Sequence, residues 1–424
     1  MKVGGVMSSI PFLLGCIADD FTGASDAASF LVNNDIPTML YNGVPQDSGS
    51  LQNCAAVVIA LKTRNAPTDE AVRDTLDAFS FVEKRGAKQF YIKYCSTFDS
   101  TPKGNIGPTV DAVLDKYDIP YTVLCPALPV NKRIVKDGYL YVDGVPLSDS
   151  HMRNHPLNPM WDSDLAKLME PQGKYVSLVL NAEEMKRSAQ ELVSLAENGA
   201  QKNTRLYIIP DYADDGDGRR IVEIFGGLRL ITGGSGLLAP LAERYRAEHG
   251  FVGVSAIDSK CPGKGIALSG SCSEATKGQI KEYRDSGHAV LAVDPGKLLD
   301  GSQTVENIWE FVCQHNEPLI HSALRSGNET EQASALLEKT FSEIGRRAFE
   351  NGYSRIIVAG GETSGAVTLA LGFDSFHIGE SIAPGVPVMV PAGHQNVRVV
   401  LKSGNFGQPD FFRRALDQTR GSAW

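Results

Sequence analysis

The chain alternates short β-branched apolar runs with longer amphipathic segments along almost its whole length. The apolar runs lie at residues 12–18, 38–41, 55–61, 89–94, 121–125, 175–180, 206–209, 229–231, 266–268, 289–293, 318–322, 355–358 and 398–401. The amphipathic segments lie at residues 68–84, 107–116, 182–197, 236–248, 273–284, 305–314, 331–350, from 363 onward and 411–418. This alternation predicts an α/β fold with mainly parallel sheets flanked by helices. Residues 137–144 depart from it, because they alternate with a period of two between Asp-Gly pairs and predict a β-hairpin.

The length of the chain and one breaker-rich stretch predict two domains. At 424 residues the chain is longer than one hydrophobic core usually supports. The pattern stops near residue 250 and restarts after the breaker cluster Cys-Pro-Gly-Lys-Gly at 261–265. We therefore expect a first domain at residues 1–250, a linker at 251–264 and a second domain at 265–424. Both should be Rossmann-like, with a ligand cleft between them.

The composition excludes several classes of partner. The formal charge is −9 and no long run of lysine and arginine offsets it, which argues against nucleic-acid binding. No segment approaches the roughly 20 apolar residues of a membrane span, and no basic region of a secretory signal precedes the first apolar run. The seven cysteines are an odd number without a Cys-x-x-Cys pair, as expected for reduced thiols. We expect a cytoplasmic protein.

Two adjacent carboxylates, Asp19 and Asp20, end the first apolar run and precede a helical pattern. In open α/β sheets, ligands bind at the carboxyl ends of the strands, beside the N-termini of the following helices. Two acids at such a place repel each other, which raises the pKa of one of them. The pair is therefore a candidate for a catalytic base. The alternative is that Asp20 or Thr22 only caps the helix.

Three glycine-rich turns in the second half follow predicted strands. They are Ser269-Gly270-Ser271-Cys272-Ser273, Ala359-Gly360-Gly361-Glu362-Thr363-Ser364-Gly365 and Lys402-Ser403-Gly404-Asn405-Phe406-Gly407. Glycine allows the backbone to approach a phosphate closely, and the N–H groups at a helix start supply donors. Three such turns on one sheet edge favour a nucleotide site. The sequence has neither a P-loop nor a strict Gly-x-Gly-x-x-Gly, and the nearest turn, at 233–236, lacks the third glycine.

Two segments of the first half suit a polar ligand. Residues 94–105 combine many hydroxyl groups with one acid and one lysine, the mixture that an anionic polyhydroxylated ligand needs. Arg64, at the end of the preceding strand, has the planar fork that binds a carboxylate. A third segment contains His151 and His155, whose spacing can bind zinc on a helix. Because Pro156 disfavours a helix and no third ligand is near, we favour a loop that covers the substrate.

These motifs together resemble the four-carbon acid sugar kinase family. The resemblance is carried by IADDFTGASDAASFL, YCSTFDSTPKGNIGP, CPALPVNKR, HMRNHPLNPMWD, VAGGETSGAV and LKSGNFG. It runs from about Ile17 to Phe412 and is specific in the YCSTFDST segment and the MRNHP loop, which resemble the 3-oxo-tetronate kinase branch. Other branches more typically have a basic residue where Pro102-Lys103 stands here.

The resemblance implies a first domain that binds an acid sugar and a second that binds ATP. It implies phosphorylation of the terminal C4 hydroxyl of a four-carbon 3-oxo acid, with Mg²⁺ bridging the ATP phosphates. Asp20 and then Asp19 are the expected catalytic bases. The other expected contacts are Arg64, Asp99, Ser100, Lys103 and Asn105 for the sugar, and Ser269, Ser271, Gly360, Gly361, Glu362, Thr363 and Gly404 for ATP. No residue is assigned to a metal, and homo-oligomerisation is left open.

Three other functions remain open at this point. D-threonate or D-erythronate would differ from a 3-oxo acid only by a donor at C3, so a few pocket residues decide between them. A dinucleotide-dependent oxidoreductase of small hydroxy acids is disfavoured by the missing glycine fingerprint. A non-catalytic acid-sugar sensor is disfavoured by the negative charge and the absence of a DNA-binding motif.

Overall fold

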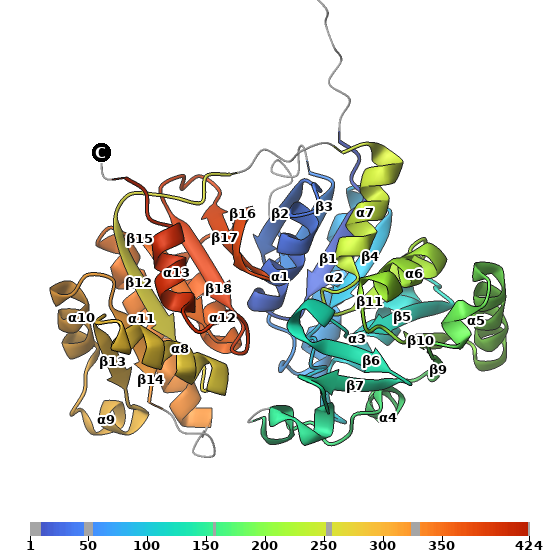
Figure 1. Cartoon of the computed structure of the whole chain (residues 1–424), viewed down its shortest axis with the longest axis horizontal. Helices are drawn as coiled ribbons and strands as arrows, with labels where there is room; N and C mark the ends of the chain where they lie inside the picture. The colour runs from blue at the N-terminus through green and yellow to red at the C-terminus, as the bar shows by residue number, and fades with distance from the viewer. Residues whose placement is uncertain (1–9, 46–53, 156–157, 252–256, 324–330, 423–424) are drawn as a thin grey trace, which may run out of the picture.

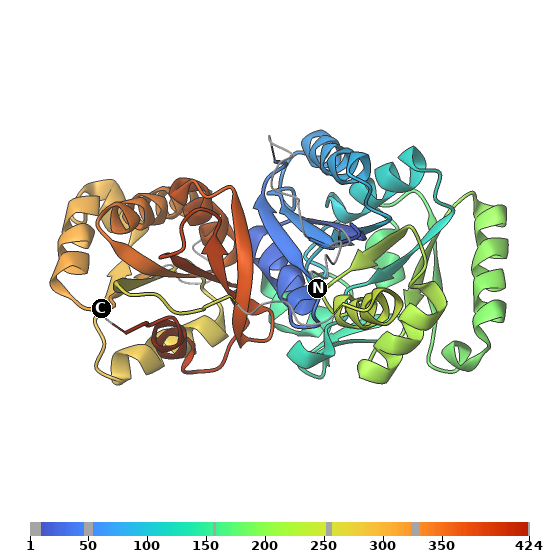
Figure 2. The same cartoon turned by 90° about the horizontal axis from the view of Figure 1, so that it is seen from above.

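A single sheet of 15 strands, flanked by helices, runs through the computed structural model of the chain (Figure 1). The structure describes residues 10–45, 54–155, 158–251, 257–323 and 331–422. The strand order is β13-β14-β12-β15-β18-β17-β16-β2-β3-β1-β4-β11-β5-β10-β9. The first-half strands thus form one block and the second-half strands another, which appear as two lobes side by side (Figure 2). The predicted α/β class with mainly parallel strands is confirmed.

All strand pairs of the first-half block are parallel. Its strands are β1 (Leu14–Ala18), β2 (Thr38–Asn42), β3 (Ala56–Ala60), β4 (Gln89–Lys93), β5 (Tyr121–Cys125), β9 (Val176–Leu180), β10 (Leu206–Pro210) and β11 (Leu230–Gly233). Its helices are α1 (Phe21–Val32), α2 (Thr68–Lys84), α3 (Ile106–Lys116), α4 (Leu165–Met169), α5 (Ala189–Asn203), α6 (Asp215–Phe225) and α7 (Leu238–His249). Every residue of β1, β3, β4 and β5 is buried, as expected for parallel strands covered on both faces.

A separate three-stranded antiparallel sheet interrupts the first half. It consists of β6 (Arg133–Lys136), β7 (Tyr139–Val142) and β8 (Val145–Pro146). Asp137 and Gly138 both have positive φ values, 53° and 77°, which is the conformation of a two-residue hairpin turn. The predicted hairpin is therefore confirmed, and a third short strand extends it.

The second-half block is parallel from β13 to β18 and antiparallel at β17 and β16. Its strands are β12 (Lys264–Ser269), β13 (Val290–Val293), β14 (Leu319–Ser322), β15 (Tyr353–Ala359), β16 (Ser375–Ala383), β17 (Val386–Pro391) and β18 (Arg398–Lys402). Its helices are α8 (Glu274–Asp285), α9 (Pro295–Asp300), α10 (Val305–Gln314), α11 (Glu331–Glu350), α12 (Gly361–Leu371) and α13 (Phe411–Gln418). The pair β16–β17 was not predicted, because glycine and proline interrupt both strands and the turn between them.

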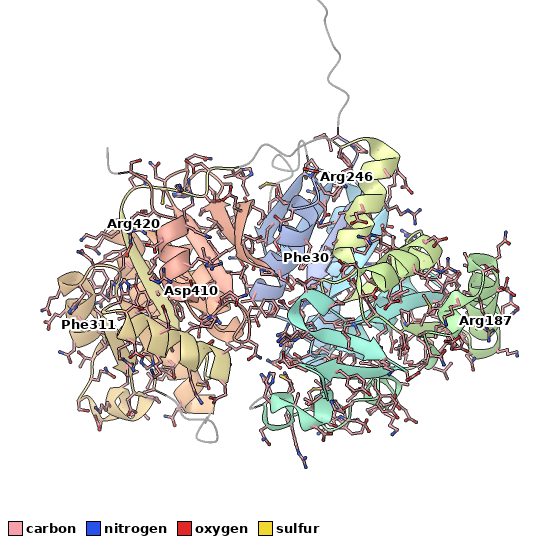
Figure 3. All side chains as sticks on the ribbon, viewed as in Figure 1. Phe30, Arg187, Arg246, Phe311, Asp410 and Arg420 are labelled. Carbon is pink, nitrogen blue, oxygen red and sulfur yellow. The ribbon has the colours of Figure 1, made fainter. Side chains whose placement is uncertain are left out.

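The two blocks are joined by strand pairing between β2 and β16. This pair is antiparallel, with Tyr41 opposite Ser375 and Met39 opposite His377. Phe30 of α1 packs against the main core and also against a second cluster built largely from the second half, and Figure 3 shows it near the junction of the lobes. The two sheets expected from the sequence are therefore continuous.

Several predicted boundaries shift for local reasons. Helix α5 begins at Ala189 rather than near 182, because Ser188 and Glu191 form a capping box. Helix α6 was not predicted, since its first turn is rich in aspartate and glycine. Lys264, predicted to end the linker, is the first residue of β12, and linker residues 252–256 lie outside the described ranges.

Two negative expectations concern membranes and disulfides. None of the helices in the described ranges is long and apolar enough to cross a bilayer. All seven cysteines lie in those ranges, and none forms a disulfide.

Candidate functional site

The acid pair lies where β1 ends and α1 begins. Asp20 is the N-cap of α1, since its Oδ1 accepts a hydrogen bond from the Gly23 N–H at 2.8 Å. Its Oδ2 accepts one from the Thr22 hydroxyl at 2.8 Å. Asp20 therefore caps the helix, as the alternative interpretation predicted. Each carboxylate oxygen has a second lone pair, so capping leaves acceptor capacity for a ligand.

Arg64 binds the acid pair from the neighbouring strand end. Its Nε and Nη2 donate to the two oxygens of Asp19 at 2.9 and 2.8 Å, and Nη2 lies 3.0 Å from Asp20 Oδ1. Its Nη1 lies 3.7 Å from Asp99. Three carboxylates thus surround one guanidinium. The fork that was expected to receive a substrate carboxylate is engaged by Asp19.

The two adjacent carboxylates differ in pKa. Burial raises the pKa of Asp19, although the Arg64 charge opposes this. Burial acts on Asp20 as well, but the charges of Arg64 and Lys93 and two hydrogen bonds bring its pKa below the ordinary value. The expected separation is present. Because burial raises the pKa of both groups, the difference comes from the charges and hydrogen bonds that outweigh burial at Asp20. Asp20 is consequently ionised at neutral pH, as a base must be.

A buried polar cluster behind the acid pair was not predicted. Lys93, the last residue of β4, is 2% exposed, and its Nζ lies 3.7 Å from Asp26 Oδ2. The Ser235 hydroxyl donates to the same oxygen, and burial raises the pKa of Asp26 to about 6. A lysine at the end of an apolar strand was the signal available in the sequence, since such a charge is rarely buried without a role.

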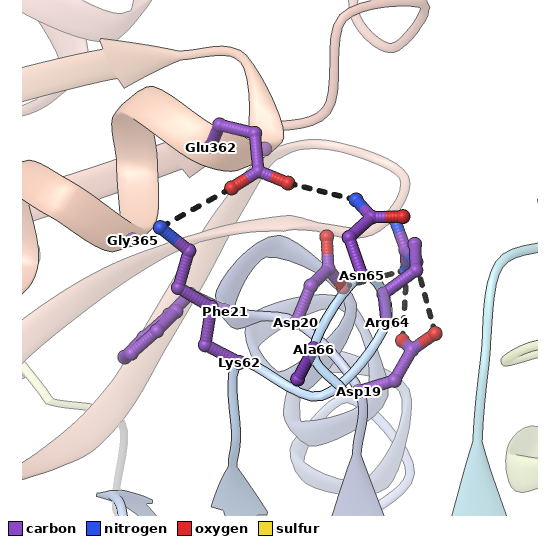
Figure 4. Close-up of a pocket in the computed structure, with 10 residues that line it drawn as sticks. Asp19, Asp20, Phe21, Lys62, Arg64, Asn65, Ala66, Glu362 and Gly365 are labelled. Carbon is purple, nitrogen blue, oxygen red and sulfur yellow. Dashed lines mark hydrogen bonds and ion pairs between the residues drawn. The ribbon is translucent and has the colours of Figure 1, made fainter. Parts of the chain in front are cut away.

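The N-terminus of α12 approaches the acid pair from the second half. A Cβ added to Gly361 would lie 3.4 Å from Asp20 Oδ2. Glu362 lies 3.4 Å from Lys62 and accepts a hydrogen bond from the Asn65 side chain at 3.1 Å (Figure 4). A pocket of about 260 Å³ lies between these groups, lined by Asp19, Asp20, Phe21, Lys62, Arg64, Asn65, Ala66, Gly361, Glu362 and Gly365.

This pocket brings together residues from both predicted ligand sets. Asp19, Asp20 and Arg64 come from the sugar-side set, and Gly361 and Glu362 come from the nucleotide set. The Glu362 carboxylate is directed at the first half and not at the other glycine turns. The pocket therefore lies on the boundary between the halves, where a transfer reaction between two ligands can take place.

The three glycine-rich turns meet at the carboxyl ends of the adjacent strands β12, β15 and β18, as predicted. Gly360 has a φ of 109°, which favours glycine, and an added Cβ would lie 3.0 Å from the Ser271 nitrogen. A Cβ on Gly270 would overlap the Thr363 hydroxyl. Ser269 is fully buried beneath this contact, whereas Ser271 is partly exposed. Of these two serines, Ser271 is the one accessible to a ligand.

Lys402, which was not predicted as a site residue, is fully buried below the third turn. Its Nζ donates to Thr276 Oγ1 at 3.0 Å, Ser403 O at 3.0 Å and Gly404 O at 2.9 Å. The Ser273 and Thr276 hydroxyls donate to the same Gly404 oxygen at 2.6 and 2.7 Å. Burial lowers the pKa of Lys402 to about 7. A buried lysine therefore anchors the Gly404 turn through hydrogen bonds.

Replacing Lys402 by methionine should change how stability depends on pH. Because its pKa is lower in the folded protein than in the unfolded chain, the wild type should lose stability as the pH falls from about 10 to about 7. Methionine removes this loss. As the pH falls from about 10 to about 7, the Tm of the variant should therefore rise relative to that of the wild type. Thermal denaturation at both pH values measures this difference. An equal Tm difference at the two pH values would contradict the lowered pKa.

The hydroxyl-rich loop supports the Arg64 turn. The Asn105 side chain donates to Thr63 O at 2.7 Å and to Ala66 O at 2.8 Å. The Ser100 hydroxyl donates to a side chain outside the loop at 2.8 Å. Ser100 and Asn105, with Asp99, line a second and smaller pocket that shares Asp19 and Arg64 with the first. Lys103, by contrast, is exposed.

The histidine segment contacts the second half instead of forming a metal site. Residues 151–154 form one turn of 3₁₀ helix, and His151 Nε2 lies 3.0 Å from Asn405 Nδ2. His155 Nδ1 accepts a hydrogen bond from the backbone of Asn158. Within the described ranges no three histidine, cysteine, aspartate or glutamate side chains are grouped to hold a metal. Pro156 of this motif lies outside those ranges.

Two family models match separate parts of the chain. Residues 14–241 match the family model of a sugar-binding N-terminal domain, and residues 266–412 match that of a nucleotide-binding C-terminal domain. A Haemophilus influenzae protein named 3-oxo-tetronate kinase is 41% identical over 417 residues, which cover 95% of this chain and 99% of the relative. The chain belongs to the four-carbon acid sugar kinase family.

Another relative and one solved structure also match almost the whole length of the chain. A Salmonella typhimurium protein named 3-oxo-tetronate kinase is 42% identical, covering 95% of this chain and 98% of the relative. A crystal structure from Salmonella typhimurium LT2, described provisionally as a tRNA synthase, has a TM-score of 0.81 and 40% identity, covering 96% and 99% of the two chains. The family models leave residues 242–265 unmatched, and these include the expected linker.

Proposed function

We propose that this enzyme transfers the γ-phosphoryl group of ATP to the terminal C4 hydroxyl of 3-oxo-tetronate. One structural observation supports it above the others: Asp20, at the start of α1, lies next to Gly361, at the start of α12, in the lining of a pocket between the two halves. A base and a helix N-terminus opposite each other are what phosphoryl transfer to a hydroxyl needs. The relatives named 3-oxo-tetronate kinase, which match almost the whole chain, support the choice of acceptor.

The first half would bind the acid sugar and the second half the nucleotide. The sugar half would extend from residue 1 to 250 and the nucleotide half from 265 to 424. The start of α12 has N–H groups without an intrahelical acceptor, which favour phosphate oxygens. Ser271 lies beside this helix start, because its backbone nitrogen is next to Gly360. Gly404 lies beside the Ser271 hydroxyl in turn. Their backbone and hydroxyl groups would complete the phosphate site.

Each residue of the pocket has a defined task in this proposal. Asp20 accepts the proton of the attacking C4 hydroxyl. Arg64 holds Asp19 and Asp20 in fixed positions through its fork, so that the base does not have to reorganise during the reaction. The N-terminus of α12 stabilises the charge on the transferred group. Closure of the pocket by both halves keeps water from competing with the acceptor hydroxyl.

In this proposal, Mg²⁺ binds together with the ATP phosphates. Within the described ranges no cluster of three ligand side chains is present. In the pocket, Arg64 engages Asp19 and Asp20, and Lys62 and Asn65 engage Glu362. These residues suit an ion that arrives with the nucleotide better than a resident metal. When bound, the ion would bridge phosphate oxygens and neutralise part of their charge.

An ATP-consumption screen across four-carbon acids tests the function. We expect ADP formation with 3-oxo-tetronate at a higher kcat/KM than with D-threonate or D-erythronate, and ³¹P NMR should place the phosphate on C4. A preference for either reduced acid would move the function to that acid. Absence of ADP with every acid, together with binding of a nicotinamide cofactor detected by fluorescence, would favour the oxidoreductase instead.

A further inference from the structure

Arg133, the first residue of β6, carries a buried charge that forms no ion pair with a carboxylate of the described residues. It is 5% exposed. Its Nη1 donates to Asn131 O, and its Nε is buried without a hydrogen-bond partner in the described ranges. Asp143 is its strongest charged neighbour, and Asp99 and Asp26 act more weakly, each from beyond the 4.0 Å of an ion pair. Burial lowers the pKa of this guanidinium by more than these acids raise it, so the charge is only partly compensated.

Two other buried arginines, Arg355 and Arg398, have more hydrogen-bond partners than Arg133. Arg355 pairs with Glu317 at 2.7 Å and also donates to backbone carbonyl groups. Arg398, whose Nε is also without a partner in the described ranges, donates to three backbone oxygens, at 2.7, 2.8 and 2.7 Å. Burial of a charge without such partners is costly, and proteins normally avoid it. The missing partner of Arg133 is therefore best sought in a ligand.

Arg133 lies at the boundary between the two halves. Its guanidinium carbon is 6.0 Å from the centre of the Phe406 ring, which belongs to the turn that contains Gly404. Its charged neighbours in the first half include Asp143 and, more weakly, Asp99, which lines the smaller pocket beside Arg64. His151, whose pKa Arg133 helps to lower, bridges to Asn405 of the same turn. The guanidinium thus sits between the sugar-side residues and the nucleotide-side turn.

We infer that Arg133 binds the carboxylate of the acid sugar. This inference rests on the proposed function, because it assigns a contact to the substrate of that reaction. A guanidinium matches the two oxygens of a carboxylate with two parallel hydrogen bonds. Arg64 is engaged by Asp19 and Lys103 is exposed, so neither offers a buried, unpaired cation. Phe406 would shield the ion pair from water when the second half is in place.

Glutamine at position 133 tests the inference through specificity. The assay compares 3-oxo-tetronate with the neutral four-carbon ketose in which a hydroxymethyl group replaces the carboxylate. Arg133→Gln should lower kcat/KM for the acid by roughly 10- to 100-fold, the value of a charged hydrogen-bonded contact. It should leave kcat/KM for the neutral ketose and the KM for ATP near the wild-type values. Arg133→Lys, which keeps the charge and loses the fork, should give an intermediate loss for the acid.

Arg398→Gln is the matched control. It removes a buried guanidinium that already has three backbone acceptors, so it should lower the Tm without changing the preference for the acid. The inference is wrong if folded Arg133→Gln loses equal activity on the acid and the neutral ketose, or keeps the wild-type preference for the acid. The proposed function would still hold in that case if the wild type phosphorylates the acid. Failure of the wild type to phosphorylate any four-carbon acid would overturn both.

Discussion

Asparagine at position 20 should lower the turnover number by roughly 10²- to 10⁴-fold, the usual contribution of a general base. Asparagine keeps the shape of the side chain and is nearly as good an N-cap, so the hydrogen bond from Gly23 should survive. It cannot accept the proton of the C4 hydroxyl. ADP affinity should remain close to the wild-type value, because Asp20 belongs to the sugar half. Steady-state kinetics and calorimetric titration with ADP measure the two quantities.

Asp214→Asn is a control that isolates the capping role. Asp214 caps α6 through the N–H groups of Gly216 and Asp217, and its replacement should leave turnover unchanged. Asp19→Asn should have a smaller effect than Asp20→Asn, because Asp19 acts mainly as the partner of Arg64. Near-normal turnover in both variants of the acid pair would mean that the pair is scaffolding. The base would then have to be sought at Asp99.

Valine at position 361 should raise the KM for ATP by roughly tenfold or more, with a much smaller change in the KM for the acid. The backbone at Gly361 has an ordinary negative φ, unlike Gly360, so the effect comes from occupied space and not from a forbidden conformation. The first side-chain carbon would already lie 3.4 Å from Asp20 Oδ2. The valine methyl groups would extend into the space beside the N–H groups of α12. Initial-rate kinetics with each substrate varied in turn measures both constants.

Gly278→Val controls for the general effect of valine on a helix. Gly278 lies in α8, and a Cβ added there meets nothing within 4 Å, so both KM values should stay near wild type. Equal increases in the two KM values of Gly361→Val would count against a phosphate role for the start of α12. Loss of the folded state, seen as a collapse of the Tm, would also contradict it.

The sequence was a good guide wherever periodicity and local chemistry agree. Helix α2 was predicted with its observed limits, and each predicted strand is present within a few residues, because apolar runs between breakers have few other solutions. The pair β16–β17 was missed because glycine and proline interrupt its pattern and because β16 also pairs with β2, which is far away in the sequence. Pairing across such a distance leaves no local pattern.

The site was only partly predictable for a related reason. Turns at strand ends identified Asp20, Gly361 and Gly404, because their position in an α/β fold follows from the element order. The roles of the cations depend on which side chains meet in space. Arg64 was expected to be available to a ligand, yet Asp19 occupies it. Lys402 and Arg133 lie within or beside strands, where burial without a carboxylate partner cannot be read from spacing.

The junction between β2 and β16 also affects how the chain is made. During synthesis the first half emerges with β2 at the end of its sheet, and the outer edge of this strand pairs only with a strand that begins at Ser375. An unpaired edge is a template for any extended segment that reaches it. The nascent enzyme therefore carries an open, aggregation-prone edge until almost the whole chain has left the ribosome. Completion of the second lobe protects that edge as well as supplying the nucleotide half.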